Sequence, residues 1–254
     1  MLHGVGDYEG ALTHYLAAYE AVRETNDERT VLRRQFLNSS IAYLQADLRD
    51  YDAALVSAQR AIDTAKSEGL EADLPDLYLL KGYIEGQMQR SEASIQSHEE
   101  AIKWAREFDY PGVVLVSMNN IGSSLIDEKQ YDQARMVLEE ALAEARAQED
   151  TYTADLLLFN LGYVDVMTGN VEAGIEAIET YAERLKPDYT DADYADLLKF
   201  IAEAYVEAGF YERATAALSR GIYSRAFMSE SAKIRFLNYK RVMKRMSRLR
   251  KSIC

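Results

Sequence analysis

Apolar side chains recur at helical spacing along most of the chain. Within residues 131–145 the apolar positions are Tyr131, Ala134, Val137, Leu138, Ala141, Leu142 and Ala145. Steps of three and four residues place these side chains on one side of a helix. Long stretches without proline and rich in Ala, Leu, Glu and Arg favour helices over strands. The pattern therefore predicts an all-α protein built from amphipathic helices.

Small residues recur in two columns that keep the same phase. One column holds Ala11, Ala54, Ser94, Ala134, Gly174 and Ala214, separated by 43, 40, 40, 40 and 40 residues. The other lies twelve residues earlier and holds Ala42, Gly82, Gly122, Gly162 and Ala202. Two helices can cross closely only where neither carries a bulky side chain. The columns therefore predict a series of antiparallel helix pairs that repeats about every 40 residues.

The helix boundaries follow from the columns and from the turn residues. Proline near a helix start and glycine at a turn mark the ends, as at Pro75, Pro111, Gly69, Gly169 and Gly209. At Asp73 and Asp109 we also expect an acceptor side chain at the helix start. The first helices of the pairs are predicted at 29–47, 74–88, 111–128, 151–168 and 190–208. The second helices are predicted at 7–25, 51–68, 91–107, 131–148, 171–186 and 211–227, followed by a last helix at 229–251.

The repeated pattern resembles the tetratricopeptide repeat over about residues 6–227. An aliphatic residue precedes glycine in the first helix, as in Ile121-Gly122, and Gly-x-Tyr-x-x-Ala crosses the turn at residues 6–11 and 209–214. The period exceeds the usual ~34 residues and resembles the extended variety of bacterial signalling and regulatory proteins. The resemblance implies a right-handed superhelical solenoid of antiparallel helix pairs, with about five and a half repeats in residues 1–227 and a capping or linker helix in 228–254.

The last part of the chain differs in charge from the rest. Residues 231–254 contain nine Lys or Arg and no Asp or Glu, against 20 and 42 in residues 1–230. The acidic body argues against nucleic acid as the ligand of the solenoid, because phosphate contacts need a positive surface. The basic helix is interpreted as a cap over the last pair, as a coiled-coil linker that could form a homodimer, or as a site for an anionic membrane or nucleic acid. Residues 224–239 resemble the segment that follows such arrays in bacterial sensor proteins.

In the repeat family the first helices line a concave groove that binds polypeptide. Carried over by helical spacing, this resemblance predicts that aromatic residues pack against side chains of the ligand and that amides pair with the ligand backbone. Lys199 is nearly the only basic residue among these positions. The candidate residues are Phe36, Tyr43, Tyr83, Asn119, Asn120, Ser123, Phe159, Asn160, Tyr163 and Lys199. Each also has a structural interpretation, the aromatics as core between helices and the asparagines as partners of their own helix or loop. The lysine and arginine set with which some relatives grip a terminal carboxylate is absent, so an apolar peptide with some positive charge suits the groove better.

The sequence contains no pattern typical of an active site. A single cysteine, Cys254, excludes a disulfide or thiolate cluster within one chain, and His3, His14 and His98 lack a paired ligand spacing. We therefore predict no catalytic residue, no metal and no cofactor. No apolar run reaches the ~18 residues of a spanning helix. We expect a cytoplasmic protein, or a periplasmic one if the chain is a fragment of a membrane-anchored sensor.

Two functions remain open at this stage. The first is a scaffold that binds a protein or peptide in its groove, as the sensory or regulatory module of a signalling system. The second is an adaptor that acts through its basic C-terminal helix on an enzyme, a membrane or nucleic acid. Loss of output with intact groove binding, after removal of residues 229–254, would favour the second.

Overall fold

The computed structural model describes residues 8–22, 28–185, 191–210 and 212–217. Throughout these residues the regular structure is helical, with no strand, which confirms the predicted all-α class. The chain divides into two compact units, residues 1–153 and 154–254. The predicted last helix at 229–251 and the predicted boundary at residue 227 lie outside the described residues.

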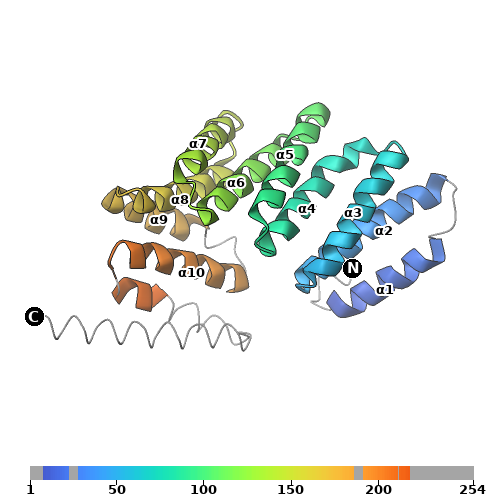
Figure 1. Ribbon diagram of the computed structural model, residues 1–254, viewed down its shortest axis with the longest axis horizontal. Helices are drawn as coiled ribbons and strands as arrows, with labels where there is room; N and C mark the ends of the chain where they lie inside the picture. Colours follow the sequence, from blue (N-terminus) through green and yellow to red (C-terminus); the bar gives the residue numbers. More distant parts are fainter. Residues whose placement is uncertain (1–7, 23–27, 186–190, 211, 218–254) are drawn as a thin grey trace, which may run out of the picture. The chain divides into compact units, whose positions relative to one another are not determined.

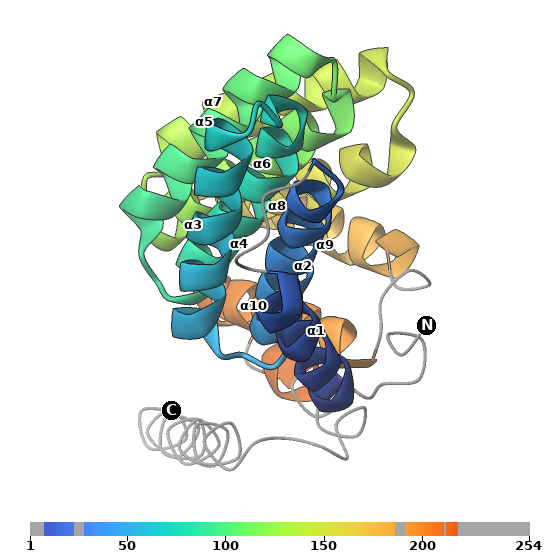
Figure 2. The ribbon, with the colours of Figure 1, turned by 90° about the vertical axis from the view of Figure 1, so that its right-hand side faces the viewer.

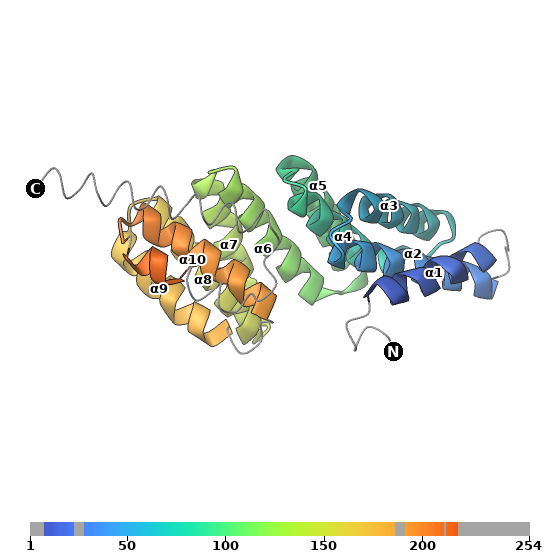
Figure 3. The same ribbon diagram turned by 90° about the horizontal axis from the view of Figure 1, so that it is seen from below.

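The first unit is a series of helices in which each packs against the next along the chain (Figure 1). Its helices are α1 (Tyr8–Val22), α2 (Glu28–Asp47), α3 (Tyr51–Ser67), α4 (Leu74–Gln87), α5 (Ser91–Phe108), α6 (Pro111–Asp127) and α7 (Tyr131–Ala147), with a 3₁₀ turn, η2 (Glu71–Asp73), before α4. Helices α2 and α4 form one layer, and α3 and α5 form the other (Figures 2 and 3). This is the predicted arrangement of antiparallel helix pairs.

The second unit continues the same pattern. Most of helix α8 (Thr151–Met167) belongs to it, and α9 (Val171–Leu185) and α10 (Asp191–Glu207) follow. Residues 212–217 form the described part of the second helix predicted at 211–227. Predicted and observed helix ends agree within three residues wherever the structure describes both.

The two columns of small residues lie where the helices of a pair cross. A Cβ atom at Gly82 would stand 2.7 Å from the ring of His98, and one at Gly122 would stand 2.4 Å from Leu138. In the second unit a Cβ at Gly174 would meet the carbonyl oxygen of Gly162 at 2.5 Å. These contacts confirm that small residues let the two helices approach.

The turns that close the helices share one backbone geometry. Gly69, Gly169 and Gly209 have positive φ, as predicted for turn glycines, but so do five residues with side chains: Arg49, Gln89, Asp109, Lys129 and Glu149. After α6 the Lys129 N–H donates to Ile126 O at 2.9 Å and the Gln130 N–H donates to Leu125 O at 2.8 Å. This is the Schellman motif, which satisfies the last carbonyl groups of a helix.

One detail of the predicted helix starts is wrong. Pro75 and Pro111 do lie in the first turns of α4 and α6, where no backbone N–H is needed. Asp73, however, makes no side-chain hydrogen bond at the start of α4. Asp109 adopts a left-handed conformation at the end of α5 and closes that helix instead.

Candidate functional site

In the first unit the first helices of three successive pairs place the same repeat positions on one face. Helices α2, α4 and α6 are neighbours, because α4 contacts both of the others. Since the period is 40 residues, equivalent positions on the three helices lie side by side. We call this surface the first-helix face and define it by Phe36, Ser39, Tyr43, Asp76, Leu79, Tyr83, Val116, Asn119 and Ser123.

Large apolar side chains on the first-helix face are open to solvent. Phe36 is 59% exposed, Tyr43 43%, Tyr83 46% and Val116 41%. The ring of Phe36 meets the edge of Tyr15 from α1, with centroids 6.2 Å apart and an angle of 88° between the planes. One exposed apolar residue needs no explanation, but four on one face of three neighbouring helices are typical of a surface that binds a partner.

A carboxylate lies beside the tyrosine of α2. Burial raises the pKa of the Asp76 carboxyl above its usual value, and the nearby Asp73 raises it further. Burial and then the charge of Asp76 raise the pKa of the Tyr43 hydroxyl. Both shifts mean that negative charge is poorly solvated here, so a positive charge brought in by a ligand would be favourable.

The predicted amide and hydroxyl groups of α6 lie at the edge of the exposed surface. Asn119, Asn120 and Ser123 are all half-buried. On α2 the hydroxyl of Ser39 donates within its own helix, to Phe36 O at 3.0 Å or to Gln35 O at 3.2 Å. An asparagine amide at the edge of the face carries both a donor and an acceptor, the two groups with which a ligand backbone pairs.

The aromatic site residues predicted in the second unit are covered. Phe159 is 5% exposed and Tyr163 is 8% exposed. Phe200 of α10 lies against both rings, with centroids 5.3 Å from Phe159 and 4.1 Å from Tyr163. Asn160 is half-buried, and the exposed Lys199 pairs with Glu203 at 3.9 Å. Of the aromatic site residues, the structure thus places three (Phe36, Tyr43 and Tyr83) in the open and two (Phe159 and Tyr163) in the interior.

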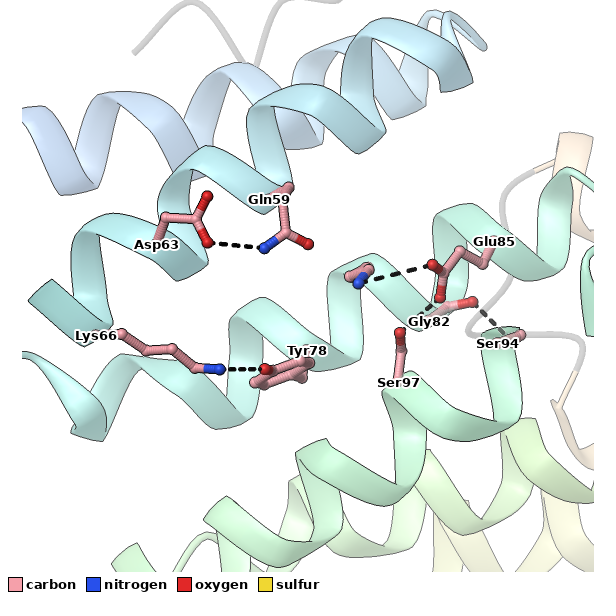
Figure 4. A network of polar contacts seen from close by, with 9 residues as sticks. Gln59, Asp63, Lys66, Tyr78, Gly82, Glu85, Ser94 and Ser97 are labelled. Atoms are coloured by element: carbon pink, nitrogen blue, oxygen red, sulfur yellow. Dashed lines mark hydrogen bonds and ion pairs between the residues drawn. The ribbon is translucent and has the colours of Figure 1, made fainter. Parts of the chain in front are cut away.

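Buried polar contacts behind the face fix α4 against α5 (Figure 4). The Ser97 hydroxyl donates to the Glu85 carboxylate at 2.6 Å, and the Ser94 hydroxyl donates to Gly82 O at 2.8 Å. One pair earlier, Ser57 donates to Gln45 at the positions equivalent to Ser97 and Glu85, at 2.7 Å. This pair of polar contacts was not predicted, although the two pairs lie one 40-residue period apart in the sequence.

A separate pocket of about 370 Å³ lies in the second unit, between α9, α10 and residues 212–217. Glu179 at its rim accepts from Tyr205 Oη at 2.8 Å and pairs with Arg213 at 3.0 Å. The lining includes Ala182, at a position where the earlier second helices carry Ile62, Ile102 and Leu142. The smaller side chain leaves part of the volume unfilled.

Within the described ranges, no group of three or more His, Cys, Asp or Glu side chains is placed to hold a metal ion. Among the described helices, none has the length and apolar character needed to cross a membrane.

The sequence and the fold were compared with known proteins. The sequence model of the tetratricopeptide repeat matches residues 75–108 and 115–148. Both segments are therefore tetratricopeptide repeats. These repeats contain α4 to α7, and therefore two of the three helices of the first-helix face. No curated protein matches the chain in sequence.

Several solved structures share the fold. Aspartyl phosphate phosphatase F from Bacillus subtilis matches with a TM-score of 0.74 at 19% identity, over 88% of this chain and 57% of that chain. The apo form of RapI matches with a TM-score of 0.75 at 12% identity, over 88% and 78%. The Rap conjugation gene regulator of the plasmid pLS20, in complex with a Phr peptide, matches with a TM-score of 0.62 at 16% identity, over 79% and 56%.

At these identities the likeness concerns the fold alone. The chain spans just over half the length of the phosphatase and of the conjugation regulator. The neighbours and the matched repeats together confirm the predicted helical-repeat architecture.

Proposed function

We propose that the chain is a peptide-binding regulatory module that holds a segment of another protein on its first-helix face. The observation that carries the proposal is the group of four exposed apolar side chains on three neighbouring helices. Phe36 and Val116 share one repeat position, and Tyr43 and Tyr83 share another. Such a group offers several anchor points to an extended or helical peptide. The Rap conjugation regulator of similar fold binds a Phr peptide, which is a ligand of the same type.

The chemistry of the face favours a ligand with apolar side chains and some positive charge. Asp76, on the middle helix of the face, is the charged residue among those that define it, and helix α6 carries no Lys or Arg. A cationic side chain of the ligand would lower the raised pKa of the Asp76 carboxyl and would lie near the aromatic face of Tyr43.

The proposal concerns binding rather than catalysis. The exposed side chains of the face are aromatic and aliphatic groups and the Asp76 carboxylate, which supply contact area and a charge but no nucleophile activated by a neighbouring base. One fold neighbour is named a phosphatase, and turnover by this chain would contradict our proposal. The cytoplasmic location and the homodimer stay predictions.

Two valine substitutions test the binding face against a matched control. A random peptide library displayed on phage is panned on the full chain, and the selected peptides are synthesised and their affinities measured. Val116→Ser removes an exposed valine from the first-helix face, while Val56→Ser removes an even more exposed valine from α3. We expect Val116→Ser to weaken binding by about three- to tenfold and Val56→Ser to leave it unchanged. Equal effects of the two variants, or no selected peptide, would refute the proposal.

A further inference from the structure

The two units treat an equivalent tyrosine differently. Tyr83 on α4 and Tyr163 on α8 occupy the same repeat position, two 40-residue steps apart. Tyr83 is 46% exposed, whereas Tyr163 is 8% exposed. Both are tyrosines at the same helical position, so the difference must come from the residues that pack against them.

The covering residue comes from the next first helix. In the second unit Phe200 of α10 lies against Tyr163, with ring centroids 4.1 Å apart and an angle of 32° between the planes. Phe200 also contacts Phe159 one turn earlier. The position equivalent to Phe200 in the first unit is Asn120 of α6, again by two 40-residue steps. Asparagine lacks the ring that would cover Tyr83, and helix α6 packs against α4.

We propose that the peptide held on the first-helix face inserts an aromatic side chain against Tyr83, over Asn120, in the place that Phe200 fills against Tyr163. This inference rests on the proposed function and names the ligand side chain that the face selects. The chain's own Phe200 shows that a phenyl ring fits the repeat at this position, in tilted contact with the tyrosine. Leu79, equivalent to Phe159 and half-buried, supplies the second wall of the site.

The asparagine gives the site a polar edge that the second unit lacks at this position. The side-chain amide of Asn120 can donate to a peptide C=O and accept from a peptide N–H. An aromatic side chain and its own backbone amide could therefore both be recognised within one helical turn of α6. A leucine or valine side chain would bury apolar area against Tyr83 but would lose the ring contact.

The test uses peptides selected from the random display library on the full chain, as above. Replacing the aromatic residue of a selected peptide with leucine should weaken binding about three- to tenfold on the wild-type chain. The same replacement should have no effect on the Tyr83→Leu variant, because the ring contact is already lost. Asn120→Phe should bury Tyr83 as Phe200 buries Tyr163 and should abolish binding, whereas Asn120→Ala should keep the preference for an aromatic residue.

Each outcome decides the inference. If Asn120→Phe does not fold, the leucine replacement in the peptide, measured on the wild-type and Tyr83→Leu chains, decides alone. Peptides that depend on Val116 but tolerate leucine at every aromatic position would overturn the aromatic site and leave the proposed function standing. If no peptide depends on Val116, both the proposed function and the aromatic site are overturned.

Discussion

The buried histidine of α5 makes the stability of the first unit dependent on pH. His98 is 1% exposed, packs against Gly82 of α4, and its Nδ1 atom has no hydrogen-bond partner. Burial lowers the pKa of His98 from 6.5 to about 4. The cause is desolvation, because an imidazolium without a partner is poorly stabilised in an apolar environment.

The sign and the size of the effect follow from the two pKa values. Between pH 6.5 and about 4 the unfolded chain binds a proton at His98 that the folded chain does not bind. The stability that comes from keeping His98 neutral is therefore fully present above pH 6.5 and is lost as the pH falls through 6.5 toward 4. At about 1.36 kcal/mol per pKa unit the loss amounts to about 3 kcal/mol of unfolding free energy.

His98→Leu is the variant that isolates this contribution. The equivalent position is Leu138 in the next pair, where leucine packs against Gly122, so the repeat accepts leucine there. Urea unfolding of both chains is measured at intervals between pH 7.5 and pH 4. We expect the wild-type chain to lose about 3 kcal/mol more than His98→Leu over this range, since the carboxylates titrate in both.

A direct titration of His98 can refute the low pKa of its imidazole. The ring proton of His98 is followed by NMR in the folded chain as the pH is lowered. If it titrates near 6.5, or if the wild-type and His98→Leu chains lose stability in parallel, the imidazole is not desolvated as its burial implies.

Three further substitutions test the packing of the repeats. Gly174→Ala should destabilise the second unit by about 1–3 kcal/mol in thermal unfolding, because its Cβ would lie 2.5 Å from a backbone oxygen of α8; an unchanged melting temperature would contradict this crossing geometry. Ser97→Val should lower the unfolding free energy in urea by about 1–3 kcal/mol, because the buried Glu85 carboxylate loses its donor at 2.6 Å. Adding Glu85→Leu should restore part of this loss, and additive losses would argue against the contact. Lys129→Gly should raise the unfolding free energy by about 0.5–1 kcal/mol, since φ is 59° there, and a loss of stability would show that the turn is not strained.

Most of the helices could be predicted from the sequence because their determinants are local. Gly82 and Ser94, for example, belong to the two columns of small residues. Each column marks the position at which one helix of a pair approaches the other. The prediction of an acceptor side chain at Asp73 failed because the same motif, Asp-x-Pro, adopts different backbone conformations before α4 and before α6. At Asp109 the preceding helix uses the aspartate for its own end, and at Asp73 a 3₁₀ turn precedes the helix.

The candidate site was predicted only in part. Helical spacing identified Phe36, Tyr43 and Tyr83 as residues of one face, and the structure exposes all three. Spacing also selected Phe159 and Tyr163, which the structure buries. No periodic argument separates Tyr43 and Tyr83 from Tyr163, because all three occupy the same position of the 40-residue repeat.

The sequence by itself determined the helix pairs, their boundaries and the positions that share one face. These properties depend on neighbours within a helix or within one pair, so a repeating pattern of small and apolar residues is enough to specify them. The tertiary structure decided which tyrosine is open. Phe200, 37 residues after Tyr163, covers that tyrosine, whereas the residue at the same spacing from Tyr83 is Asn120, which has no ring. Residues so far apart in sequence meet only through the packing of successive first helices.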